Sequence, residues 1–188
     1  MNEELENKYA SLLVNRCLDL SRSNSLFINY YSDNKSLVEK ITELAKNKGI
    51  TDIYLAEDSI YEKHKHLEQT IEQIKKDKYF DSKIWDVYAK KKSAFLMLST
   101  EFPEFFDDIN PQNISAASLK VRTTKPLYKK LQLTNDISWC IAVMPNKIWA
   151  KAKFPELSEE EAYNKMFLLM MEATMVTKKS QSKNGITY

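Results

Sequence analysis

The stretch Ala94–Ser99 reads AFLMLS and is the most apolar run of strand length in the chain. Three comparable runs are Ser25–Tyr31 (SLFINYY), Asp52–Ala56 (DIYLA) and Ile137–Met144 (ISWCIAVM). Short strands that are apolar at most positions are typical of a parallel sheet, because helices cover both faces of such a sheet. The four runs therefore predict buried strands of one mainly parallel sheet.

The segments between these runs repeat apolar residues at steps of three and four, which predicts amphipathic helices. The main stripes are Leu5–Leu20, Leu37–Ala45, Ile60–Ile74, Asn113–Leu131 and Ala162–Val176. Strands that alternate with helices predict a three-layer α/β domain, with a mainly parallel sheet of about four or five strands and helices on both faces. We expect this domain to span residues 1–176 and the polar residues 177–188, which lack periodicity, to form a mobile tail.

Local signals mark where several of these helices begin and end. Ser36–Glu39, Ser59–Glu62 and Ser158–Glu161 have the spacing of a capping box, in which a hydroxyl and a carboxylate satisfy free N–H groups at a helix start. Gly49 follows the second helical stripe, where a left-handed residue ends a helix. Pro126 is expected to kink or interrupt the helix from Asn113 to Leu131.

Glycine content excludes several enzyme classes. The 188 residues include two glycines, Gly49 and Gly185, which lie far apart. Phosphate-binding loops, dinucleotide-binding turns and nucleophile elbows need two or three glycines within a few residues, because the backbone must turn tightly or approach phosphate closely. None of these motifs is present.

Charge and cysteine content predict the compartment. The formal charge is +2, which is too close to neutral to indicate nucleic acid or membrane as a partner. Two cysteines do not make a disulfide framework in a chain of this length. The acidic start lacks the apolar segment of a signal peptide, and the longest apolar run, Met166–Met171, is too short to span a bilayer. We expect a cytoplasmic protein with no membrane partner.

Two groups of side chains suggest chemistry, and each has a plainer interpretation. His64, His66 and Glu68 could indicate metal, but positions 64 and 66 project to opposite sides of a helix, so we expect His64 half-buried and the other two solvated. Cys17 lies on the apolar face of a predicted helix and Cys140 within a predicted buried strand, which favours core packing over nucleophilic catalysis. The residues themselves indicate no catalytic and no metal site.

The region 118–153 carries eight basic residues and one acid, Asp136, which gives a local charge of +7. With Tyr128, Trp139 and Trp149 it could form a nucleic-acid groove or meet an acidic partner, although a solvated lysine face explains the same pattern. The methionines of the last helix favour core packing over a partner groove. A stand-alone binding or interaction domain that uses this Lys-rich face is therefore the alternative function.

The segment from Trp139 to Ala162 resembles the pattern W-x-x-x-x-x-P-x-x-x-W-A-x-x-x-F-P-x-L-S-E-E-E-A of AmpS-type thermophilic metallo-aminopeptidases. The matching residues are Trp139, Pro145, Trp149, Ala150, Phe154, Pro155, Leu157, Ser158, Glu159, Glu160, Glu161 and Ala162. Because the pattern has fixed spacing and three aromatic positions, it is specific. We expect these residues to have a structural role.

The resemblance implies a family of peptidases that release N-terminal amino acids from peptides with two divalent metal ions of the zinc or cobalt class. It also implies a homodimer in the full enzyme. The family's metal ligands lie in a C-terminal catalytic domain that nothing in residues 1–188 matches. The resemblance therefore implies the N-terminal α/β domain alone, without cofactor, inactive by itself, and partnered by the missing catalytic domain; nucleic acid is not an expected partner.

Overall fold

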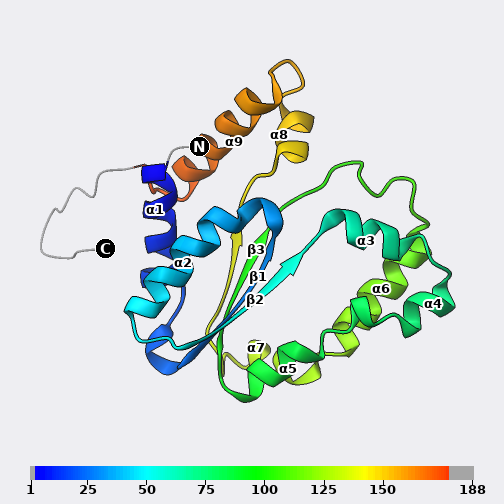
Figure 1. The fold of residues 1–188 in the computed structure, drawn as a ribbon, viewed down its shortest axis with the longest axis horizontal. Helices are drawn as coiled ribbons and strands as arrows, with labels where there is room; N and C mark the ends of the chain where they lie inside the picture. Colours follow the sequence, from blue (N-terminus) through cyan, green and yellow to red (C-terminus); the bar gives the residue numbers. More distant parts are fainter. Residues whose placement is uncertain (1–2, 178–188) are drawn as a thin grey trace, which may run out of the picture.

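The computed structural model describes residues 3–177 of the chain (Figure 1). Its centre is a four-stranded sheet in the order β2-β1-β3-β4, with every neighbouring pair parallel. The strands are β1 (Ser25–Tyr31), β2 (Asp52–Asp58), β3 (Ala94–Ser99) and β4 (Trp139–Val143). The predicted α/β fold and parallel sheet are confirmed. The predicted tail lies outside the described residues, apart from Thr177.

Nine α-helices lie within residues 3–177, and they alternate with the strands along the chain. They are α1 (Glu3–Leu12), α2 (Lys35–Asn47), α3 (Ile60–Leu67), α4 (Ile71–Lys76), α5 (Lys83–Lys90), α6 (Pro111–Thr123), α7 (Pro126–Leu133), α8 (Lys147–Lys153) and α9 (Glu159–Ala173). A π-helical turn η1 (Leu13–Cys17) and the short 3₁₀ turns η2 (Leu20–Arg22), η3 (Ser32–Asn34) and η4 (Lys78–Phe80) join them. None of the helices in this part of the chain is both long and apolar enough to cross a lipid bilayer.

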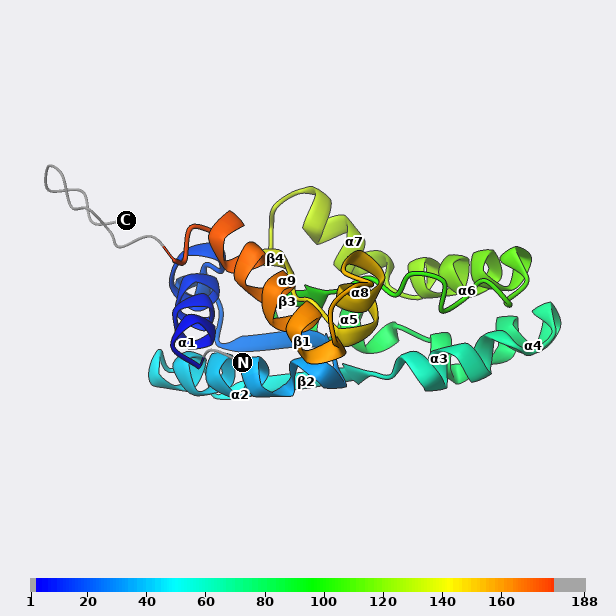
Figure 2. The same cartoon turned by 90° about the horizontal axis from the view of Figure 1, so that it is seen from above.

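The two central strands place successive side chains in two different cores. Leu26 and Ile28 of β1 pack into one core with α1, α2 and α9, whereas Phe27 packs into the other with α5 and α7. All three side chains are fully buried. Strands covered on both faces must be apolar at consecutive positions, which is why the two central runs are so apolar. Figure 2 shows the helices on the two sides of the sheet.

A helical lobe extends from the carboxyl ends of the strands (Figure 1). It contains α3, α4, η4 and α6, which pack around their own small core of Leu67, Ile74, Phe80, Ile109 and Ala117. A second extension is the hairpin of α8 and α9, which packs around Ala150, Ala162 and Met166. The carboxyl ends of the strands, where the loops after the strands begin, are therefore flanked by the helical lobe and by the α8–α9 hairpin.

Edge strand β4 is less covered than the sequence predicts. In β4 the side chains of Trp139, Ile141 and Val143 are 38%, 54% and 43% exposed, while Ala142 between them is buried. The expectation of a fully buried fourth strand is therefore wrong. β4 forms one edge of the sheet, and α5 and α7 pack on the neighbouring part of that face, around Phe27 and Phe95.

Helix boundaries confirm some local signals and correct others. Gly49 has φ +88° and ends α2 with a Schellman pair of bonds, since its own N–H bonds Lys46 O and the next N–H bonds Ala45 O. The chain breaks between α6 and α7 just before Pro126, as predicted. The expected cap at Ser36 is wrong, because its hydroxyl donates to Glu6 Oε2 at 2.9 Å.

The stripe from Ile60 to Ile74 forms two helices where the sequence predicts one. α3 ends at Leu67, and Thr70 begins α4 with a complete capping box to Gln73. The Thr70 hydroxyl accepts from the Gln73 backbone N–H, and the Gln73 side-chain oxygen accepts from the Thr70 backbone N–H, which stabilises this new helix start. Of the four apolar residues of the stripe, Ile60, Leu67 and Ile74 are buried nevertheless, and Ile71 is half-buried.

Candidate functional site

A cavity lies at the carboxyl ends of the strands, where open parallel sheets commonly bind ligands. Its volume is about 250 Å³, and it is lined by Tyr31, Ser32, Asp33, Ile60, Tyr61, Phe102, Lys147, Ile148 and Glu159. These residues come from the segments that follow β1, β2 and β3, and from the α8–α9 hairpin. The strand order reverses between β1 and β3, so this is the topological switch point of the sheet.

Aromatic rings and charges share this cavity. The rings of Tyr31 and Phe102 meet edge to face at 4.9 Å, and burial raises the pKa of Tyr31 to about 12. Lys147 pairs with Glu159 at 2.9 Å across the start of the α8–α9 hairpin. The site therefore has neutral phenol and phenyl walls, one ion pair and the exposed carboxylate of Asp33, an arrangement suited to holding a small, partly apolar group.

The family motif follows the path from β4 through the α8–α9 hairpin. The buried members of the motif are Pro145, Ala150 and Ala162, and the half-buried ones are Trp149, Phe154 and Leu157. Trp139 lies on the exposed face of β4. The remaining members are exposed, namely Pro155, Ser158, Glu159, Glu160 and Glu161. Trp149, Phe154 and Leu157 pack against the core of the hairpin. Only Glu159 among the twelve lines the cavity. A structural role for the set remains a prediction, and the contacts favour it.

Hydrogen bonds within the motif fix the turn between α8 and α9. Ser158 and Glu161 form the predicted capping box, since each side chain accepts a bond from the backbone N–H of the other residue. Lys151 Nζ donates to the carbonyl oxygens of Pro155 and Leu157 at 3.0 and 2.6 Å. Backbone N–H and C=O groups in the turn between two helices have no partner within either helix, and these side chains supply the missing hydrogen bonds.

Asn146 is the residue of this segment that sequence analysis missed. It is 1% exposed, and its Oδ1 accepts from Trp149 N at 2.8 Å, which caps α8. Its Nδ2 donates to Thr100 Oγ1 at 2.8 Å and to Glu101 O at 2.7 Å, just after β3. An asparagine just before a helical stripe predicts a helix cap. The bonds to Thr100 and Glu101, more than forty positions away, cannot be predicted from the sequence.

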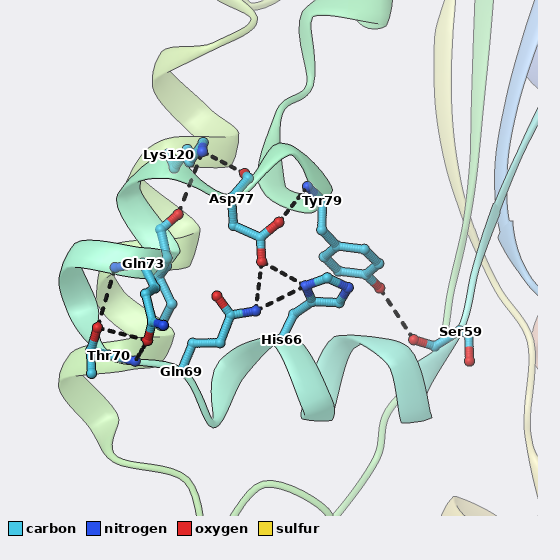
Figure 3. Close-up of polar contacts among 9 residues, drawn as sticks. Ser59, His66, Gln69, Thr70, Gln73, Asp77, Tyr79 and Lys120 are labelled. Carbon is cyan, nitrogen blue, oxygen red and sulfur yellow. Dashed lines mark hydrogen bonds and ion pairs between the residues drawn. The ribbon is translucent and has the colours of Figure 1, made fainter.

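A polar cluster in the helical lobe contains His66 (Figure 3). Nδ1 of His66 lies 2.5 Å from Asp77 Oδ2, and the imidazole stacks on the ring of Tyr79 with centroids 4.2 Å apart. Gln69 Nε2 donates to the same carboxylate at 2.9 Å, and Lys120 Nζ donates to the Asp77 carbonyl oxygen. The expectation that His66 is solvated is wrong, because Asp77 and Tyr79 at η4 contact its imidazole.

His64 is turned to a different carboxylate. Its Nε2 lies 2.9 Å from Asp108 Oδ1, and Glu68 Oε1 approaches Nδ1 at 3.7 Å. The half-buried position predicted for His64 is confirmed, as is the exposure of Glu68. The two histidines thus bond to different carboxylates, His64 to Asp108 and His66 to Asp77. Within residues 3–177, His, Cys, Asp and Glu side chains do not gather in groups of three that could hold a metal ion, so these residues do not fit a dinuclear centre.

Stability at low pH should depend on Asp77. Burial acts to raise the pKa of its carboxyl, but bonds from Tyr79 N–H, His66 and Gln69 outweigh it and lower the pKa overall. A lowered folded-state pKa stabilises the fold above the unfolded value of about 3.9, and this contribution is lost as pH falls through the folded value. Asp77→Asn should therefore show a smaller fall in melting temperature between about pH 6 and pH 3. Asp107→Asn, in an exposed loop, is the control, and equal falls in both variants would contradict the prediction.

The structure places the two cysteines in different environments. Cys17 is exposed at the end of η1, and Cys140 is half-buried in β4. The predicted core position of Cys17 is wrong, because η1 turns this residue outward while Leu13 and Val14 face the core. Cys140 packs at the margin of the core that contains α1 and α2.

The Lys-rich region is divided among separate environments. Lys125 Nζ lies 3.7 Å above the Trp85 ring, Lys120 donates to backbone carbonyls of the lobe, and Lys147 and Lys151 are engaged in the α8–α9 hairpin. Arg122, Lys129 and Lys130 lie around a shallow hollow at α7. Four of the basic side chains thus have partners within the domain, and the nucleic-acid alternative remains an untested prediction.

The fold is that of a parallel α/β domain, and comparison with known proteins defines its family. Residues 2–184 match the family described as thermophilic metalloprotease (M29). The chain therefore belongs to this family.

Curated relatives include Aminopeptidase 2 of Geobacillus stearothermophilus, which is 24% identical over 172 residues, covering 90% of this chain and 41% of that protein. Aminopeptidase AmpS of Bacillus subtilis (strain 168) is 23% identical over 171 residues, covering 90% of this chain and 42% of that protein. The structure of wild-type AmpT from Thermus thermophilus superposes with a TM-score of 0.79 at 19% identity, covering 91% of this chain and 43% of that chain. The chain thus spans about two fifths of the length of these relatives, and the likeness to AmpT concerns the fold.

Proposed function

We propose that this chain is the N-terminal α/β domain of a metal-dependent aminopeptidase that releases N-terminal amino acids from peptides in the cytoplasm. One observation carries the proposal: the family match extends over residues 2–184, while the matched aminopeptidases are more than twice as long as the shared region. Its role is architectural. The domain presents the cavity between β1 and β3 as one wall of the substrate site and supports a homodimer of the full enzyme.

The two divalent metal ions, of the zinc or cobalt class, belong in this proposal to the remaining part of such an enzyme. Both histidines of the chain already bond carboxylates on different elements, Asp77 for His66 and Asp108 for His64. Recruiting them to one centre would break both pairs. The chain alone is therefore proposed to be inactive.

An apolar groove on the α8–α9 hairpin is where we place the catalytic part. It has a volume of about 330 Å³ and is lined by Lys153, Phe154, Met166, Leu169, Met170 and Ala173. Leu169 is 48% exposed there. The groove reaches Ala173, the last residue of α9. Exposed apolar surface of this kind commonly marks an interface.

The test compares the chain alone with a chimera. The purified chain, supplied with cobalt or zinc, should release no leucine from a leucyl peptide, with Aminopeptidase 2 as the positive control. A chimera in which residues 2–184 replace the matched part of Aminopeptidase 2 should release leucine. Activity that stays with the purified chain and its bound metal, or an inactive but folded chimera, would contradict the proposal.

Two variants of the chimera test the groove. Leu169→Lys places a charge in the proposed interface, so leucine release should fall about tenfold or more, because an unpaired buried ammonium is costly. Leu133→Lys makes the same change at a 74% exposed position of α7 and should leave the rate within about twofold. Equal rates in the two variants would place the catalytic part elsewhere.

A further inference from the structure

The two cysteines of the chain are neighbours in space although they are far apart in sequence. η1 lies against β4, and the Cys17 thiol is within hydrogen-bonding contact of the Cys140 thiol. Two residues further along, Asp19 N donates to Ser138 Oγ at 2.8 Å. The segment after η1 therefore runs antiparallel beside the start of β4, with positions 17 and 19 opposite 140 and 138.

Both partners are held in place by the elements around them. Leu18 and Leu20, on either side of Asp19, are 4% and 8% exposed and anchor this segment in the core. Cys140 lies in register with Leu96 in the parallel pairing of β3 with β4. A disulfide needs two cysteines with closely spaced α-carbons, and the thiol contact together with the Asp19–Ser138 bond places the two segments side by side.

We propose that Cys17 and Cys140 form a redox-sensitive site that closes to an intramolecular disulfide on reaction with a small-molecule disulfide. The bond would tie the amino-terminal segment to the edge strand of the sheet. This inference is independent of the peptidase proposal, because it concerns the state of this domain and needs no metal or peptide.

The steps follow thiol–disulfide exchange. The thiolate of exposed Cys17 attacks one sulfur of the small disulfide, whose S–S bond breaks, and one half leaves as a thiolate. The Cys140 thiolate then attacks Cys17 Sγ in the mixed disulfide and displaces the second half. Two protein thiols are oxidised to one disulfide, one small disulfide is reduced to two thiols, and the two cysteine protons end on those products.

The environments of the two thiols set this order. Cys17 is exposed and can meet the reagent, whereas Cys140 is half-buried. Burial, together with the adjacent Cys17 thiol, raises the pKa of Cys140 to about 11, so the Cys140 thiol is largely protonated at neutral pH. Cys17 is therefore the attacking residue and Cys140 the resolving one.

The experiment treats the reduced chain with oxidised glutathione at neutral pH and measures intact mass under denaturing, non-reducing conditions. The product should have lost two hydrogen atoms, have no thiol left for alkylation, and yield one linked peptide pair containing Cys17 and Cys140. Cys140→Ser should instead stop as the glutathione adduct of Cys17, and Cys17→Ser should react far more slowly. The disulfide closes a loop of roughly 120 residues, so the oxidised chain should melt several degrees higher than the reduced one.

Three results would overturn the proposal. They are glutathione adducts that persist on the wild-type chain, disulfides only between chains, and thiols that both remain open to alkylation after treatment. Because Cys17 is exposed, Cys17→Ser should fold like the wild type, and circular dichroism of each variant checks this. The readouts do not involve leucine release, so they are separate from the test of the peptidase proposal.

Discussion

Phe27→Ala should lower the free energy of unfolding by about 3–5 kcal/mol, which is a large part of the stability of a typical domain. Phe27 is fully buried in central strand β1, and its ring lies 4.6 Å from Trp85 and 5.3 Å from Phe95, measured between centroids. Rings of Tyr54 and Tyr88 complete the cluster at 5.2 and 5.5 Å. Truncation removes the one ring that contacts all four others, and the surrounding helices and strands cannot close the space.

Urea unfolding followed by tryptophan fluorescence measures this loss, because Trp85 is part of the cluster. Tyr61→Ala is the matched control: it removes an aromatic ring that is 69% exposed, and its effect should stay within about 0.5 kcal/mol. If Phe27→Ala does not fold, Phe27→Leu retains most of the volume and should lose less. Equal midpoints for the Phe27 and Tyr61 variants would show that the cluster does not stabilise the sheet.

The central strands could be predicted because their side chains are apolar on both faces. Leu26 and Ile28 enter one core and Phe27 the other, and consecutive apolar residues of this kind have few other stable arrangements. The stop at Gly49 and the cap at Ser158 were equally readable, since each depends on groups within a few residues. The family motif can be identified for the same reason, because its residues are close together in the sequence.

The edges of the sheet could not be predicted in the same way. Ile141 and Val143 are as apolar as residues of β3, yet they are exposed because the helices of that face, α5 and α7, pack around Phe27 and Phe95 of the neighbouring strands. Apolar character shows that a side chain can be buried, and it does not show that another element covers it. The partners of His66 and the contact between Cys17 and Cys140 could not be predicted either, because both depend on how segments that are distant in the sequence pack together.

Asn146→Ala should lower the free energy of unfolding by about 2–4 kcal/mol, from the lost cap and from buried polar groups left unpaired. The side chain is 1% exposed and makes three bonds of 2.7–2.8 Å, to Trp149 N, Thr100 Oγ1 and Glu101 O. Two of these bonds join the start of α8 to the end of β3, beside the cavity. Urea unfolding gives the total loss, and amide hydrogen exchange should show faster exchange in the first turn of α8.

Two further variants separate the cap from the link to β3. Asn110 caps α6 by accepting from Gln112 N at 2.9 Å and is exposed, so Asn110→Ala should cost only about 1 kcal/mol. Asn146→Asp keeps the acceptor for Trp149 N but turns a carboxylate oxygen toward the Glu101 carbonyl, so it should restore little of the lost stability. Losses that are equal at Asn146 and Asn110, or full recovery in Asn146→Asp, would mean that Asn146 acts only as a helix cap. A larger, unrecovered loss at Asn146 would mean that the amide donor holds α8, and with it Lys147 and Ile148, against the end of β3, which gives the cavity its wall.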